Sequence, residues 1–252
     1  MSMLATLAID DNIAEEKDSL GGGSSVLESA LYPMTVALAY MGKSDGGAMS
    51  LNLLLKGEDG RDLKQTLWIT SGTAKGCKPY YENKDGEKSY LPGFLHADAL
   101  ALLTVGKKIN TLDTEEKVIN VWSSAARAEV PTKVQMVTEL LGQEITVGLI
   151  KQTVDKTRKN EATGQYEATG ETRDENEIDK LFRTRDGKTT SEIRAQAEEA
   201  TFIKSWGEKW TGKTKNKAKN AGSNGTAGAP KSPFGAPATA AATRKPASSL
   251  FG

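Results

Sequence analysis

Aromatic residues alternate with lysines between residues 63 and 90, and this pattern indicates a surface for unpaired nucleotides. Apolar residues occupy every second position of one predicted strand, and Trp68 falls on its polar face, where a core does not require it. Binding of single strands without sequence preference needs both residue types, because cations follow the phosphates while flat rings stack on unpaired bases. The candidate contacts in this region are Lys64, Trp68, Lys75, Lys78, Tyr80, Tyr81, Lys84, Lys88 and Tyr90.

A second basic run lies in a predicted long hairpin over 145–170. Its side chains could bind phosphates, although a basic run of this kind more often belongs to a solvated hairpin. Each ring of the first region could likewise cover a neighbouring helix, and Glu82, Asp85 and Glu87 weaken the attraction for a polyanion there. The sequence leaves both interpretations open. The candidate contacts in the second run are Lys151, Lys156, Arg158 and Lys159.

The residue inventory argues against several other functions. Cys77 is the only cysteine and His96 the only histidine, so an intramolecular disulfide and a zinc site of four Cys or His ligands are excluded. His96 lies in an apolar stretch, which indicates packing and not catalysis. Segment 72–78 lacks the spacing of a Walker loop. We therefore predict a protein that is not an enzyme and uses no metal or cofactor.

Charge is distributed unevenly along the chain. The 33 basic and 33 acidic residues cancel, but residues 211–252 carry +7 and no acid, which leaves −7 on residues 1–210. Lys245, Leu250 and Phe251, near the end of this basic stretch, are candidates for docking on another protein. No stretch approaches the roughly 20 apolar residues of a membrane helix, and a signal-peptide pattern is missing at the start, so an intracellular protein without membrane association is expected.

Apolar periodicity predicts a mainly β fold with added helices, an α+β class. Period-two alternation indicates a strand from Tyr32 and a hairpin whose second strand contains Trp68. Short antiparallel strands with a helix after the third suit an OB-like antiparallel barrel, with a β-sandwich as the alternative. Further elements are predicted as helices over 94–105 and 131–141, strands over 118–122 and 145–149, and one amphipathic helix over 193–210.

The predicted organisation has four parts. The final part should be disordered, because a Gly-, Ala- and Pro-rich chain buries too little apolar surface to offset its ordering entropy. The parts are an N-terminal lead-in (1–30), an OB-like single-stranded DNA-binding domain (31–172), a helical segment packed on that domain (173–210) and a basic tail (211–252).

Several stretches carry a resemblance to a known family. The chain resembles the single-stranded DNA-binding proteins of podophages that package a giant virion RNA polymerase. The likeness spans nearly the whole chain, and the basic tail that ends in SLFG fits it as well. The stretches are EEKDSLGGG (15–23), YPMTVALAYMGKSDGGAMSLNL (32–53), YLPGFLHADALALLTVGK (90–107), EVPTKVQMVTELLGQ (129–143) and NEIDKLFRTRDGKT (176–189).

The resemblance implies a protein of phage DNA replication and recombination that works in the cytoplasm of the infected bacterial host. It also implies help to the virion polymerase at hairpin promoters, and activation of the host RNA polymerase through the C-terminal end. Tyr80 and Tyr81 then become the ring candidates, and Leu250–Phe251 with Lys245 the protein contact. One departure matters: bacterial single-strand binders end in an acidic tip, whereas this tail is basic.

Three functions from different classes compete at this point. The first is a DNA-binding module that holds single strands, and DNA hairpins, open for replication proteins. The second is an adaptor that activates an RNA polymerase through its tail, with DNA binding secondary. The third is a nuclease, which would need carboxylates that converge from separate strands. We rank them in this order.

Overall fold

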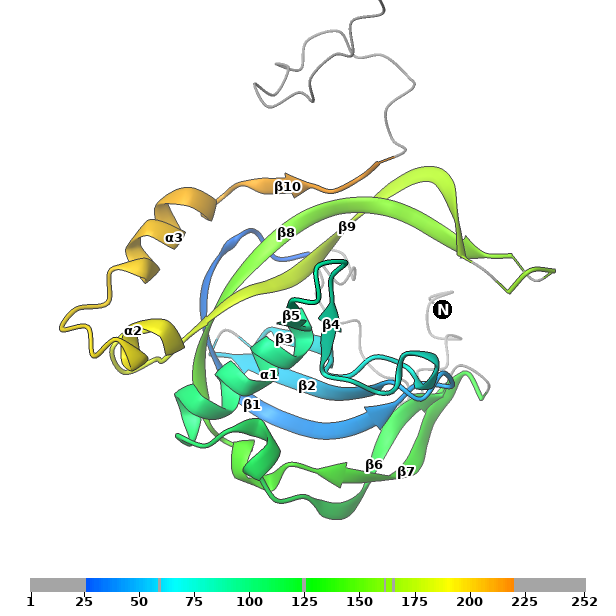
Figure 1. Ribbon diagram of the computed structural model, residues 1–252, viewed down its shortest axis with the longest axis horizontal. Coiled ribbons are helices and arrows are strands. Elements are labelled where there is room, and N and C mark those ends of the chain that lie inside the picture. The colour runs from blue at the N-terminus through cyan, green and yellow to red at the C-terminus, as the bar shows by residue number, and fades with distance from the viewer. Residues whose placement is uncertain (1–25, 59, 124–125, 161, 165, 220–252) are drawn as a thin grey trace, which may run out of the picture.

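The computed structural model describes residues 26–58, 60–123, 126–160, 162–164 and 166–219 (Figure 1). It is mainly β with added helices, as predicted. The helices are α1 (Pro92–Thr104), α2 (Thr190–Arg194) and α3 (Phe202–Trp210). The strands are β1 (Ala30–Lys43), β2 (Met49–Gly57), β3 (Asp62–Trp68), β4 (Tyr80–Glu82), β5 (Lys88–Tyr90), β6 (Glu115–Ser123), β7 (Ala128–Met136), β8 (Glu144–Lys159), β9 (Tyr166–Phe182) and β10 (Thr214–Asn216).

One bowed sheet carries most of the molecule, and β1 lies at its centre (Figure 1). The first half of β1 pairs antiparallel with β8, the end of β1 pairs with β7, and its other edge pairs with β2. β3 follows β2, while β9 follows β8. This arrangement confirms the predicted 49–69 hairpin, the 118–122 strand and the long 145–170 hairpin.

The two ends of the sheet approach each other but do not pair. β3 and β9 are linked by the Gln65 side chain, whose Nε2 donates to the Asn176 carbonyl oxygen at 3.2 Å. The side chain of Asn176 in turn accepts from the Leu27 N–H (2.8 Å) and donates to the Leu27 carbonyl oxygen (2.7 Å). Among the described residues the sheet is therefore open along a β3–β9 seam, and the predicted barrel is not closed by main-chain pairing.

The main core lies between the inner face of this sheet and α1. α1 contributes four buried side chains, which pack against alternate residues of β1, β2, β3 and β8. His96 is half-buried on this helix, with its Nε2 3.3 Å from the Asp179 carbonyl oxygen, as the predicted packing role requires. The helix predicted over 94–105 is thus confirmed over 92–104. The buried residues of α1 are Ala97, Leu100, Ala101 and Leu103.

The predicted helix over 131–141 is wrong. Residues 128–136 form β7 instead, and only a short 3-10 turn follows at Thr138–Leu140. Pro131 and Gly142 resemble helix boundaries, because proline is common at the first helical position and glycine is common just beyond the last one. The alternation of Val130, Thr132, Val134 and Met136 outweighs those signals, because these residues form the half-buried to buried face of a strand paired with β6.

The predicted start of the helical segment at residue 173 is also wrong, because β9 continues to Phe182. Gly148 pairs with Lys180 and Leu149 with Ile178, so Asp179 is the extra residue of a β-bulge. The bulge places Ile178 and Leu181 in the main core and turns Phe182 to the opposite face. The three-residue spacing of Ile178 and Leu181 resembles the period of a helix, which explains the wrong prediction.

The helix predicted over 193–210 is divided into α2 and α3. Gln196, in the link between them, has a left-handed backbone (φ 52°). Thr189 and Glu192 form a capping box at the start of α2, and the Glu192 carboxylate also accepts the N–H groups of Thr201 and Phe202, both at 2.9 Å. Glu192 therefore fastens the start of α3 to the start of α2.

Glu192→Gln should destabilise this helical unit by about 1–3 kcal/mol at neutral pH, because hydrogen bonds to a charged group are lost. Partial burial opposes ionisation, but the N–H groups of Thr189, Phe202 and Thr201 lower the pKa of Glu192 to about 2. The carboxylate therefore stabilises the fold above its unfolded pKa of 4.5, and this contribution is lost as the pH falls from there toward about 2.

Thermal unfolding of wild type and variant at several pH values tests this prediction. The difference between them should be largest near neutral pH and should shrink on acidification. A difference that stays constant down to about pH 2 would contradict the assigned role of the carboxylate charge.

Residues 214–216, predicted to belong to the disordered tail, form a strand instead. β10 pairs parallel with β8, from Thr214 opposite Lys151 to Asn216 opposite Thr153. The buried Ser29 holds the start of this strand: its hydroxyl accepts the Lys151 N–H and donates to the Lys213 carbonyl oxygen. Residues 220–252, including Lys245, Leu250 and Phe251, lie outside the described residues, as does most of the lead-in. No helix of the described segments has the length and apolarity needed to cross a membrane.

Candidate nucleic-acid interface

The outer face of β3 is polar and ends at Trp68. Cross-strand register places Trp68 opposite Ser50 and Thr66 opposite Asn52, and Thr66 Oγ1 donates to Asn52 Oδ1 at 2.9 Å. The intervening residues Leu63 and Leu67 are buried on the inner face. The Trp68 side chain is 47% exposed, as its predicted position on the polar strand face requires.

The loop after β3 holds a cation next to this tryptophan. The Ile69 N–H donates to the Met49 carbonyl oxygen (2.9 Å), and the Thr73 N–H donates to the Gly46 carbonyl oxygen (2.8 Å). These bonds tie the loop to the β1–β2 turn. Lys75 is exposed on this loop and lines the same cavity as Trp68. These main-chain bonds therefore fix the loop that carries Lys75 at the cavity that Trp68 also lines.

The predicted tyrosine candidates occupy the β4–β5 hairpin. Tyr80 lies opposite Tyr90, whereas Tyr81 lies opposite Ser89, so Tyr80 and Tyr81 point to opposite faces. The Tyr80 ring lies between Lys88 Nζ, 5.3 Å from its centroid, and Lys78 Nζ at 5.8 Å. The structure thus separates the expected Tyr80–Tyr81 pair and groups Tyr80 with Tyr90.

Two tyrosines of this hairpin remain open to solvent. Tyr81 is 55% exposed and Tyr90 is 53% exposed. Tyr90 stacks on Phe94 at a centroid distance of 4.8 Å, which leaves its other ring face available and fixes its orientation. Tyr81 and Tyr90 are therefore the rings of this hairpin most suited to stack on a base.

The basic run on the long β8–β9 hairpin divides into two parts. Lys151 forms ion pairs with Glu28 (2.8 Å) and Asp174 (3.8 Å), and its hydrogen bond to Glu28 raises its pKa. Lys156 is paired with Glu171 at 2.8 Å. These two lysines are engaged in internal contacts, so the prediction that all four residues of the run face DNA is weakened for them.

The tip of the same hairpin is better suited to a nucleic acid. Arg158 and Lys159 are exposed and form no ion pair with another described residue. Tyr166 lies directly opposite Lys159 and is 71% exposed. The sequence reasoning missed Tyr166 because it treated this residue only as part of the returning strand.

Trp122 on β6 was also missed. It is 64% exposed, on the face of the hairpin that carries Val118 and Asn120, while Ile119 and Val121 are half-buried. This alternation is visible in the sequence and could have identified Trp122 by the argument applied to Trp68. In Figure 1 the β6–β7 hairpin, the β1–β2 turn and the β8–β9 hairpin project toward the same side of the view.

The charge of the candidate surface comes from cations without acidic partners among the described residues. Those lysines are spread over β3, the following loop and the β4–β5 turn. Glu82, Asp85 and Glu87 are exposed in that turn, so its net contribution is small. The unpaired cations near the rings are Lys64, Lys75 and Lys84, with Lys78 and Lys88 in contact with the Tyr80 ring.

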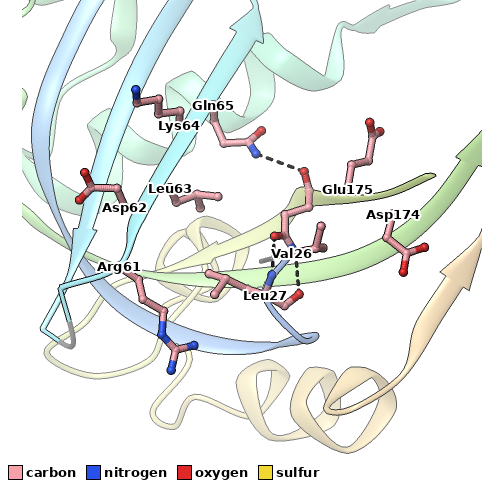
Figure 2. Close-up of a pocket in the computed structure, with 10 residues that line it drawn as sticks. Val26, Leu27, Arg61, Asp62, Leu63, Lys64, Gln65, Asp174 and Glu175 are labelled. Atoms are coloured by element: carbon pink, nitrogen blue, oxygen red, sulfur yellow. Dashed lines mark hydrogen bonds between the residues drawn. The ribbon is translucent and has the colours of Figure 1, made fainter. Parts of the chain in front are cut away.

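The β3–β9 seam contains a cavity of about 760 Å³ (Figure 2). Gln65, Asn176 and Leu27 meet there through the hydrogen bonds described above. The lining carries three acidic and two basic residues, so it offers a polyanion no net attraction. Its charged residues are Arg61, Asp62, Lys64, Asp174 and Glu175.

The described residues include no group of three or more His, Cys, Asp or Glu side chains placed to hold a metal ion. The exposed rings and unpaired cations of this surface are residue types that can stack on bases and contact phosphates.

Comparison with known proteins identifies no family for this chain. No protein-family model matches the sequence, and no curated protein shows significant similarity to it. The resemblance to podophage single-strand binders stays a prediction from the quoted stretches.

Proposed function

We propose that this protein binds single-stranded DNA without strong sequence preference and acts as a binding module, not as an enzyme. The observation that carries the proposal is Trp68, a half-exposed tryptophan on the polar face of β3 that also carries Lys64, with Lys75 lining the same cavity as Trp68. An exposed indole on such a face adds nothing to the core. Stacking on an unpaired base gives it a role, at about 1–3 kcal/mol per base.

The order of the strands supports an OB-type scaffold as part of this proposal. β1, β2 and β3 form a meander, α1 follows, and β8 returns to pair with β1 before β9 pairs with β8. In OB-folds, oligonucleotides bind on the face of the second and third strands and between the loops that flank it. Here that face carries Trp68, and the long β8–β9 hairpin corresponds to one flanking loop.

The cellular role that fits this activity is the one implied by the sequence resemblance. Coating of single strands would keep templates open, and hairpins extruded, during phage DNA replication, recombination and transcription in the host cytoplasm. The alternative is an adaptor that contacts RNA polymerase through Lys245, Leu250 and Phe251. β10 fixes residues 214–216, near the start of this basic stretch, on the domain.

Titration of tryptophan fluorescence with single-stranded, duplex and hairpin DNA at two ionic strengths tests the proposal. Oligothymidylate should quench the fluorescence and bind more tightly than duplex, because paired bases are already stacked. The logarithm of the binding constant should fall linearly with the logarithm of salt, with a slope of about −0.7 per neutralised phosphate. Equal affinity for duplex and single strand, at both ionic strengths, would reject the proposal.

A further inference from the structure

A cavity of about 740 Å³ lies at the junction of β3, α1 and β9, directly beside Trp68. It adjoins the seam cavity, because Gln65 lines both. Trp68 and Lys75 line it from β3 and the following loop, Leu91 and His96 from the start of α1, and Ile178 from β9. Its volume lies in the range of roughly 300–1,000 Å³ that is common for small-ligand sites.

Close main-chain contacts preform the walls of this cavity. A Cβ atom on Gly93 would lie 2.2 Å from the Trp68 carbonyl oxygen, so only glycine allows α1 to start against β3. A Cβ atom on Gly72 would lie 2.8 Å from the Gly46 carbonyl oxygen, where the loop meets the β1–β2 turn. The cavity is therefore held open by backbone packing and does not depend on movement of long side chains.

The lining has the chemistry of a site for a flat ring with polar edges. Leu91, Pro92 and Ile178 supply apolar surface, His96 supplies a polar group, and the Glu177 carboxylate is paired with Lys217 at 2.6 Å. Burial lowers the pKa of His96, so its imidazole is neutral near pH 7 and can offer a hydrogen bond without adding charge. Lys75 supplies the positive charge.

We propose that this cavity receives one unpaired nucleobase, turned out of the strand that crosses the β2–β3 face. The inference rests on the proposed function and adds a nucleotide pocket to it. Trp68, at the opening, stacks on the bound strand, and Lys75 contacts the phosphate next to the inserted base. Complementarity between the lysine and the phosphate backbone favours a nucleotide over an apolar side chain of a partner protein.

The first test fills the cavity without altering the outer sheet face. Ala74 lines the cavity and is exposed, so Ala74→Trp should reduce its volume without unfolding the protein. We expect affinity for oligothymidylate to fall about tenfold, which corresponds to the lower part of the range for one lost base contact. Ala195→Trp, at an exposed position after α2, is the matched control and should leave affinity unchanged. Circular dichroism and thermal unfolding of both variants monitor folding.

The second test locates the base in the wild-type protein. A strand with iodouracil in place of thymine is photocrosslinked and the modified peptides are mapped. A base inside the cavity should crosslink to His96 as well as to Trp68, because His96 lies on the inward-packed side of α1. Crosslinks at Trp68 without His96, together with unchanged affinity in Ala74→Trp, would overturn the nucleotide pocket and leave single-strand binding intact. If the wild-type protein fails to prefer single strands at all, the proposed function itself fails.

Discussion

Trp68→Ala should lower the affinity for oligothymidylate by about tenfold to a hundredfold while the protein stays folded. Loss of one stacked ring removes about 1–3 kcal/mol, and the Trp68 side chain, at 47% exposure, contributes little to the core. The measurement is a fluorescence anisotropy titration with a labelled strand, because the substitution removes part of the intrinsic signal. The free energy of unfolding should change by less than about 1 kcal/mol.

Phe202→Ala is the matched control for this prediction. Phe202 is 43% exposed, and Lys180 Nζ lies 5.4 Å from its ring centroid, so it also combines an exposed ring with a lysine. It belongs to α3, on the outer side of β8 and β9 and away from the β2–β3 face (Figure 1). Its truncation should leave affinity unchanged. Equal losses in the two variants would mean that rings bind DNA wherever they are exposed, and that the β2–β3 face is not the site.

The rings and the cations around Trp68 contribute differently to the proposed binding. Lys64 lies four residues before Trp68 on the same face of β3, and Lys75, on the loop after β3, lines the same cavity as Trp68. Phosphates along a single strand can contact these cations while successive bases reach the tryptophan and the β4–β5 hairpin. Cations alone would bind duplex equally well. The preference for single strands therefore depends on the rings.

The parts of the site that depend on local pattern could be predicted from the sequence. Alternation along β3 predicted both the buried face and the exposure of Trp68, because the side-chain period of a strand is two. The turn at 57–60 and the helix that contains His96 followed from similarly local signals. Exposed Trp122 obeys the same rule and was recoverable.

The remaining parts depend on pairings that no local pattern reveals. The bulge at Asp179 changes the period of β9 and so imitates a helix. Lys151 is neutralised by Glu28, which is distant in sequence. β10 forms only because Ser29 and β8 offer it hydrogen-bonding partners. The cavity beside Trp68 likewise needs β3, α1 and β9 to meet in space.

Trp206→Ala should have the largest effect on stability, about 3–5 kcal/mol, because it empties a buried position and leaves a polar group without its partner. Trp206 is 3% exposed, packs edge-on against Phe182 and donates from Nε1 to Asp179 Oδ2 at 2.7 Å. Chemical denaturation gives the free energy of unfolding. Trp210→Ala is the control and should cost less, because Trp210 is only half-buried.

The Trp206→Ala variant also tests whether α3 contributes to DNA binding as well as to stability. Asp179 is the bulge residue of β9: its carboxylate accepts from Trp206 on the outer face, and its carbonyl oxygen lies near His96 on the inner face. If the bulge holds its shape without Trp206, the variant should lose stability but keep its affinity for single strands below the unfolding transition. A parallel loss of affinity would show that α3 supports the nucleotide pocket through Asp179 and His96. The outer helix would then be part of the binding apparatus.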